Sequence, residues 1–136
     1  MVRWHMLDDL RRVLASEPGI AYALVFGSAA RLALHAGSDV DVAIELSPGA
    51  PRDVLALGTL AARLESAVGR RVDLVLLDEA PSPLAYRVFR EGRLLLEHDH
   101  AALVRRKARA IVEYLDFKPI EELCAAGVLR AAARGR

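Results

Sequence analysis

Two aspartates are spaced so that their carboxylates can act together. Asp39 and Asp41 lie two residues apart in DVDVAIEL, which alternates acidic and apolar residues before becoming wholly apolar. In a strand, residues two apart point to the same face, and their Cα atoms are about 6.6 Å apart. Such a pair can hold two cations roughly 3.5 to 4 Å apart, as two-metal phosphoryl chemistry requires. Taken alone, the pair is more typical of a solvated loop or cap.

A third acidic residue interrupts the next apolar stretch. Asp73 stands in RRVDLVLLD, where burying an unpaired carboxylate is costly. A metal ion or an exposed strand end would remove that cost, and so would an ion pair with Arg70 or Arg71. If a metal is bound, ligands that are all oxygen favour magnesium or manganese over zinc.

A small-residue turn precedes the aspartates. Gly27 and Ser28 end an apolar strand and begin a helix, so the backbone N–H groups there can approach an anion such as a triphosphate. Arg31, about one helical turn later, can add a bidentate phosphate contact. The alternatives are that Ser28 only caps the helix and that Arg31 forms a surface ion pair.

Together these stretches resemble the nucleotidyltransferase superfamily that includes the polymerase-β-like enzymes. The matching stretches are Gly27-Ser28-Ala29-Ala30-Arg31, Ser38-Asp39-Val40-Asp41 and Val72-Asp73-Leu74. The short chain and its Tyr114-Leu115-Asp116-Phe117-Lys118-Pro119 stretch are similar to the minimal nucleotidyltransferases (MNT) that act as antitoxins. The resemblance covers most of residues 20–120, and the link LALHAG after Arg31 is less polar than the family's usual link.

The resemblance implies a magnesium-dependent adenylyltransferase. It implies transfer of AMP from ATP to a tyrosine hydroxyl of a HEPN-domain ribonuclease toxin, alone or within a homo-oligomer or a hetero-oligomer with that toxin. It implies two Mg²⁺ ions, with Asp73 also helping to deprotonate the acceptor. The residues implied to be catalytic and metal-binding are Asp39, Asp41 and Asp73. The residues implied to bind the nucleotide are Gly27, Ser28, Arg31 and Ser38.

Two other functions remain open from the sequence. A nucleotidyltransferase acting on a small molecule such as an aminoglycoside needs a pocket, and 136 residues leave little chain to build one without a dimer. A binding-only antitoxin has no use for three acidic groups at one site. The transferase acting on a protein is therefore the leading hypothesis.

Composition excludes several other classes. Apolar residues make up 54% and charged residues 27%, which excludes disorder, and 5% aromatic residues argue against a base-stacking binder. The net charge of +1 gives no overall attraction to nucleic acid or membranes. One cysteine excludes an internal disulfide. A charged N-terminus without an apolar signal core or membrane span predicts a cytoplasmic location.

The elements that must position these residues can be placed from periodicity and from glycine and proline. We expect strands at 20–26, 39–46, 70–78 and 93–97. We expect helices at 2–16, 29–36 (capped by Ser28), 53–68, 84–91, 100–115 and 120–132, the last two separated by Phe117-Lys118-Pro119.

This pattern predicts an α/β (α+β) fold, with a mixed sheet of about four strands flanked by helices. The resemblance makes it a single nucleotidyltransferase domain over 1–136, with a core of about 1–98 and a helical C-terminal arm of about 99–136. Residues 101–136 carry 8 basic and 4 acidic side chains, a charge of +4. The arm's apolar residues are expected to dock a protein partner or to pack on the sheet; they are Leu115, Phe117, Ile120 and Leu123.

Overall fold

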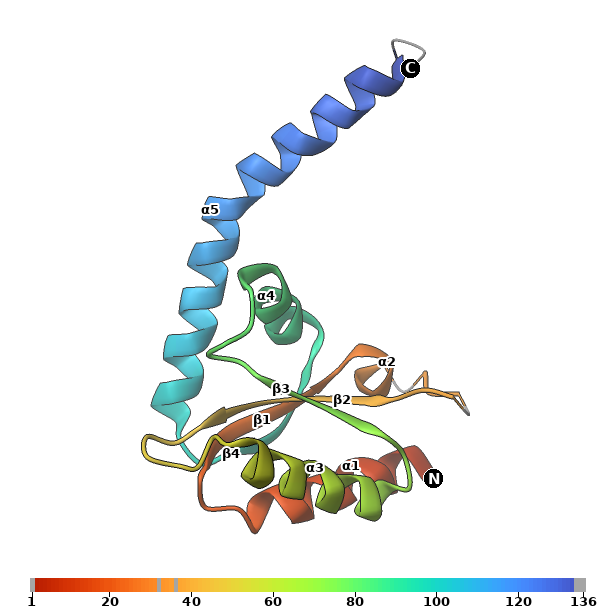
Figure 1. Ribbon diagram of the computed structural model, residues 1–136, viewed down its shortest axis with the longest axis vertical. Coiled ribbons are helices and arrows are strands. Elements are labelled where there is room, and N and C mark those ends of the chain that lie inside the picture. The colour runs from red at the N-terminus through yellow and green to blue at the C-terminus, as the bar shows by residue number, and fades with distance from the viewer. Residues whose placement is uncertain (1, 32, 36, 134–136) are drawn as a thin grey trace.

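A computed structural model describes the backbone of residues 2–31, 33–35 and 37–133, and the side chains of 5–31, 33–35, 37–116, 118, 119 and 122. Helices and strands follow one another along the chain, and Figure 1 shows their arrangement. In order they are α1 (Val2–Ala15), β1 (Ile20–Phe26), α2 (Gly27–Ala30), β2 (Val40–Leu46), α3 (Val54–Val68), β3 (Val72–Leu76), α4 (Ser82–Glu91), β4 (Arg93–Glu97) and α5 (His100–Ala133).

The described strands form one mixed sheet of four strands, in the order β3-β2-β1-β4. β1 is antiparallel to both of its neighbours, whereas β2 and β3 are parallel. The parallel pair needs a crossover, and α3 supplies it. The predicted α+β fold with a four-stranded mixed sheet is confirmed.

Helices cover both faces of the sheet, and the alternation along β2 decides which residues face which helices. α1 and α3 lie on one face and α4 and α5 on the other (Figure 1). Val40, Val42 and Ile44 belong to the core beneath α1 and α3, and Ala43 to the core beneath α4 and α5. Since side chains alternate along a strand, Asp41 points to the same side as Ala43.

The short helix after β1 differs from the prediction of a Ser28-capped helix at 29–36. α2 ends at Ala30, and Ser28 lies inside it, with Phe26 at the cap position and no side-chain cap. Gly27 has a φ of +66°, so the chain turns directly out of the strand and the helix begins two residues earlier than expected. The Ala33 N–H donates to the Ser28 carbonyl at 2.9 Å, a bond that closes the turn and ends the helix.

The predicted break at Phe117-Lys118-Pro119 is wrong. α5 is one helix with Pro119 inside it. Proline removes only one backbone donor, and the Leu115 carbonyl that would have accepted from it belongs to an exposed residue, where water can replace the bond. Figure 1 shows this part of α5 extending past α4 and away from the sheet. No described helix is both long and apolar enough to cross a membrane.

The helix predicted at 53–68 is confirmed as α3, with two local signals at its ends. The Asp53 side chain accepts a hydrogen bond from the Ala56 N–H, and Gly69 adopts the left-handed conformation at the C-terminal cap. Val54 is 89% exposed rather than on the buried face, because that face begins one turn later. β3 is shorter than the predicted 70–78, since Arg70 and Arg71 belong to the junction before it.

Candidate active site

The three aspartates lie at or just before the starts of the neighbouring strands β2 and β3. Asp41, the second residue of β2, pairs in register with Asp73 on the parallel strand β3 and with Phe26 on β1. Asp39 directly precedes β2. Gly27, the residue after Phe26, therefore lies at the same edge as the aspartates. The predicted grouping of the aspartates with the glycine turn is thus a consequence of strand register.

The carboxylates act on one another electrostatically. Asp41 is half-buried, whereas Asp39 and Asp73 are exposed. The pKa of Asp41 is raised, first by burial and then by the negative charges of Asp73 and Asp39. A positive charge from Arg87 works in the opposite direction. Burial and crowding with like charge are the conditions in which a bound cation is most favourable.

Gly27 leaves room for the central carboxylate. A Cβ atom at this position would stand 2.4 Å from Oδ2 of Asp41, closer than any real contact. The φ of +66° is also strained for any residue with a side chain. The sequence indicated a glycine for close approach of a phosphate. The structure adds a second reason, which is that the glycine backbone packs directly against Asp41.

The ion-pair alternative for Asp73 is wrong. Within the described part of the chain, Asp73 forms no salt bridge, and its carboxylate avoids the cost of burial because it is exposed. Arg70 instead donates from Nη1 to the carbonyl oxygens of His35, at 2.7 Å, and Ser38, at 3.2 Å. Arg71 is exposed beside it.

The residues expected to bind the nucleotide lie around the same edge. Ser28 is half-buried in α2, and Arg31 is exposed just after it. In the described part of the chain Arg31 has no ion pair, so its surface-pair alternative is also wrong. The Ser38 hydroxyl accepts a hydrogen bond from the His35 N–H at 3.0 Å, which uses one of its lone pairs to close the turn before Asp39.

Arg87 is a residue of this site that sequence reasoning missed. It lies on α4, far along the chain from the motifs, yet its charge acts on Asp41. Its side chain is 57% exposed and lies 4.0 Å from the Glu91 carboxylate on the same helix. Local spacing holds no signal for it, because only the packing of α4 on the sheet brings it to this edge.

The donor set fits a hard cation. All three carboxylates lie at the same ends of neighbouring strands, and oxygen-only donors suit Mg²⁺ or Mn²⁺. In their described positions, no three His, Cys, Asp or Glu side chains converge closely enough to enclose an ion. Asp41 and Asp73 are nevertheless paired in register on neighbouring strands.

A mixed sheet with three acidic groups beside a glycine turn defines the nucleotidyltransferase class. Residues 8–101 match the family described as polymerase beta, nucleotidyltransferase. The chain therefore belongs to this family and is a nucleotidyltransferase. Comparison with curated proteins finds no match.

Solved structures share the fold. A chain in a crystal structure of a toxin–antitoxin with AMP-PNP has a TM-score of 0.75 and 24% identity, covering 90% of this chain and 98% of that one. A chain in an MntA-HepT toxin–antitoxin structure has a TM-score of 0.69 and 22% identity, covering 91% and 97%. A chain in a structure of tri-AMPylated Shewanella oneidensis HEPN toxin with MNT antitoxin has a TM-score of 0.71 and 22% identity, covering 93% and 98%.

Proposed function

We propose that this chain is the MNT antitoxin of a HEPN toxin and silences it by transferring AMP from ATP to a tyrosine hydroxyl, with Mg²⁺, in the cytoplasm. The observation that carries the proposal is the row formed by Gly27, Asp41 and Asp73, with Asp39 beside it. The similar folds found with AMP-PNP and with an AMPylated HEPN toxin support the choice of ATP and of the partner.

The three aspartates have defined roles in this proposal. Asp39 and Asp41 would hold two Mg²⁺ ions, and Asp73 would complete the site. Bound Mg²⁺ would neutralise charge on the triphosphate and the pyrophosphate that leaves. The crowding that raises the pKa of Asp41 is relieved when cations are bound, so the same crowding favours metal binding.

In the transfer step one P–O bond forms, another breaks, and the hydroxyl proton is accepted by a carboxylate. The tyrosine oxygen attacks the α-phosphorus of ATP and forms a new P–O bond. The bond from the α-phosphorus to the bridging oxygen of the β,γ-pyrophosphate breaks. The hydroxyl proton passes to the carboxylate of Asp73, which is exposed and therefore open to an acceptor from another protein.

The glycine turn and nearby polar groups would hold the triphosphate. The first N–H groups of α2 have no partner within the helix, and small side chains at Gly27 and Ser28 let phosphate oxygens approach them. Arg31 and Ser38 would add contacts from the segment leading to Asp39. Arg87 would contribute positive charge from the opposite side.

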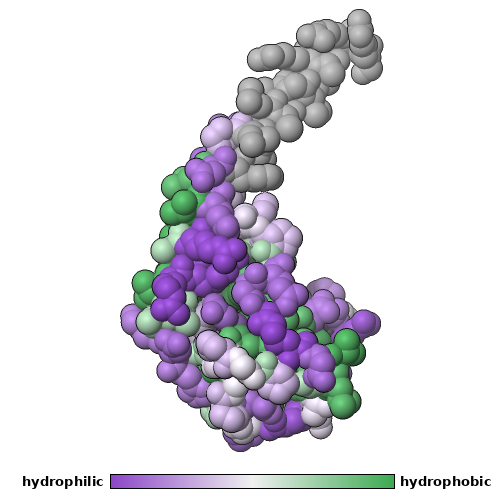
Figure 2. Space-filling view, turned by 60° about the vertical axis from the view of Figure 1, so that its left-hand side comes forward, coloured by the Kyte–Doolittle hydropathy of each residue, from purple (hydrophilic) through white to green (hydrophobic). Residues whose placement is uncertain are grey.

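The partner would dock on α5. Apolar side chains of this helix are exposed, and Figure 2 shows hydrophobic residues along one edge of it. Val104, Ile111, Val112 and Leu115 are between 40% and 59% exposed. The side chains of Phe117, Ile120 and Leu123, also expected to be anchors, lie outside the described residues. Truncation after Leu115 is expected to leave ATP binding nearly intact and to weaken partner binding and AMP transfer together.

The deciding experiment combines this chain with the HEPN toxin proposed as its partner and with ATP labelled at the α-phosphate. We expect label on a toxin tyrosine, located by peptide mass spectrometry, only when Mg²⁺ is present and Asp41 is intact. A binding-only antitoxin would neutralise the toxin equally well as wild type and as Asp41→Asn. Label found on an aminoglycoside and not on the toxin would favour the small-molecule enzyme.

A further inference from the structure

The junction between α3 and β3 contacts the start of both strands that carry the aspartates. The chain leaves α3 at Gly69, and the side chain of Glu65 accepts a hydrogen bond from the Val72 N–H at 3.0 Å. The Arg71 carbonyl accepts one from the Val40 N–H at 2.9 Å. These bonds place the first residues of β2 and β3 side by side, one residue before the paired aspartates.

Arg70 extends this junction to the turn that precedes Asp39. Its Nη1 donates to the carbonyls of His35 and Ser38, at 2.7 and 3.2 Å. The same turn is closed by the Ser38 N–H bonded to the His35 carbonyl at 3.0 Å and by the His35 N–H bonded to the Ser38 hydroxyl at 3.0 Å. One guanidinium therefore links the end of α3 to both ends of a four-residue turn.

The position of Asp39 depends on this turn, whereas the positions of Asp41 and Asp73 depend on strand pairing. Asp41 and Asp73 are held by the β2–β3 ladder, whereas Asp39 lies before the first residue of β2 and is exposed. Its neighbour Ser38 has one of the two carbonyls that accept a hydrogen bond from Arg70. Bonds from a charged donor are stronger than those between neutral groups, which suits a link across 32 residues of chain.

We propose that Arg70 is a positioning residue for Asp39: by fixing the His35–Ser38 turn it sets where this carboxylate stands for the cation. The inference rests on the proposed metal site. Arg70 makes no ion pair with a carboxylate among the described residues, so its effect passes through the backbone of the turn. Removing a side chain that orients a metal ligand typically lowers the metal affinity about 10- to 100-fold.

The test uses the full chain without a toxin and Mn²⁺ as the probe ion, in the presence of AMP-PNP. Calorimetric titration is expected to show about tenfold weaker Mn²⁺ binding in Arg70→Ala, at the lower end of that range. Hydrogen exchange at Ser38, Asp39 and Val40 should be faster. Arg71→Ala, the matched control for an exposed neighbouring arginine, should leave both measurements unchanged.

Two further variants keep the result interpretable. Arg70→Lys retains a cationic donor and should recover most of the Mn²⁺ affinity, whereas Arg70→Gln should not; the pair serves equally if the alanine variant fails to fold. Wild-type affinity and exchange in both Arg70→Ala and Arg70→Gln overturn the inference. Wild-type Mn²⁺ affinity in Asp41→Asn would instead overturn the proposed metal site itself, so the two failures are distinguishable.

Discussion

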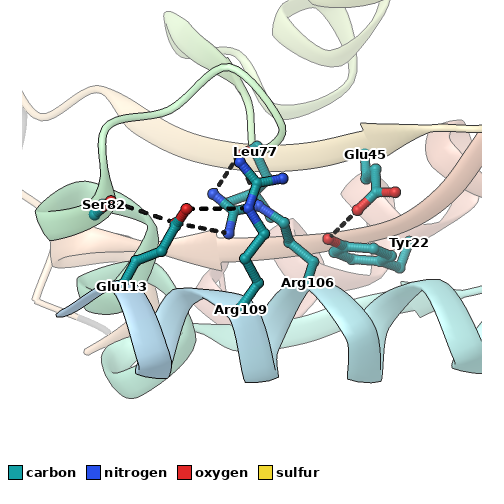
Figure 3. Close-up of polar contacts among 7 residues, drawn as sticks. All are labelled: Tyr22, Glu45, Leu77, Ser82, Arg106, Arg109 and Glu113. Atoms are coloured by element: carbon teal, nitrogen blue, oxygen red, sulfur yellow. Dashed lines mark hydrogen bonds and ion pairs between the residues drawn. The ribbon is translucent and has the colours of Figure 1, made fainter. Parts of the chain in front are cut away.

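The two ends of strand β2 carry carboxylates in opposite electrostatic settings. At one end Asp41 is crowded by Asp39 and Asp73, and its pKa is raised. At the other end, about 13 Å along the same face by strand rise, Glu45 accepts a hydrogen bond from the Tyr22 hydroxyl at 2.6 Å. Figure 3 shows this bond and, separate from it, a cluster of hydrogen bonds and ion pairs made by Arg106, Arg109 and Glu113 of α5.

This second cluster joins α5 to the sheet. Arg106 is 4% exposed and donates from Nε and Nη2 to the Leu77 carbonyl, at 3.1 and 2.9 Å. Its Nη1 has no hydrogen-bond partner among the described groups but lies 3.8 Å from Glu113. Glu113 accepts from Ser82 and Arg109, and the Arg109 bond is the main cause of its lowered pKa. Here every carboxylate has a donor.

The difference separates function from stability. Burial and the hydrogen bond to Glu45 raise the pKa of Tyr22, so its hydroxyl stays a neutral donor. In the α5 cluster the Glu113 carboxylate accepts hydrogen bonds from Ser82 and Arg109, which stabilises the fold. Among the described residues no side chain donates a hydrogen bond to the aspartate cluster, an arrangement that destabilises the folded chain but suits the proposed cation site.

The largest expected effect is at the aspartate cluster. Asp41→Asn should abolish AMP transfer, because the central carboxylate of the proposed metal site is lost, and should raise the melting temperature of the metal-free protein at pH 7. The folded chain holds the Asp41 proton more tightly than the unfolded chain, so its stability falls as pH rises through the window above 3.8. The asparagine variant removes this loss.

The measurement is thermal melting by circular dichroism from pH 3 to 8, with transfer followed by label from ATP. The gap between variant and wild type should close as the pH falls below 3.8, where both are neutral at this position. Undiminished transfer, or a lower melting temperature for the variant at pH 7, would show that the aspartate cluster does not serve activity at the expense of stability.

At the α5 cluster we expect a large loss of stability. Arg106→Ala removes a buried side chain and leaves the Leu77 carbonyl without its donors, so we expect a loss of about 2 to 4 kcal/mol. In a domain of this size, that lowers the melting temperature by roughly 10 °C. Arg105→Ala, at the exposed neighbouring position, is the control and should change it little. Equal melting temperatures for the two variants would mean that Arg106 does not anchor α5.

Gly27→Ala should affect the site more than the fold. The added Cβ displaces the Asp41 carboxylate, so transfer and AMP-PNP binding should both weaken, with a stability loss of about 1 to 2 kcal/mol from the positive φ. Gly49→Ala is a matched control, because its φ is +84° and nothing lies within 4 Å of the new Cβ. Similar stability losses but normal transfer in Gly49→Ala would assign the activity effect to Asp41.

The smallest effect is a pH dependence of opposite sign at Glu113. Its pKa is lowered in the folded chain, so its stabilisation is present above its ordinary pKa of 4.5 and is lost as pH falls through the lowered value. Glu113→Gln should therefore be slightly less stable than wild type at pH 7 and equal to it at low pH. A gap that widens on acidification would show that the Arg109 bond does not stabilise the charged form.

The sequence determined the parts of this protein that depend on local spacing. The apolar run at 20–26 forms β1, Asp53 and Gly69 mark the ends of α3, and the apolar residues of 40–46 form β2 directly after Asp39. The three motifs also sufficed to place the chain among nucleotidyltransferases, a placement that the family match over 8–101 confirms. Each of these signals acts within a few residues, so it can be read without knowing what packs against it.

The tertiary structure decided what depends on distant segments. It alone pairs Asp41 with Asp73, brings Arg87 of α4 to the aspartates, and sends Arg70 to carbonyls instead of to the carboxylate beside it in sequence. It also carries α5 through Pro119, because an exposed helix can lose one backbone bond to water. No local pattern encodes these outcomes, since each depends on the register and packing of elements tens of residues apart.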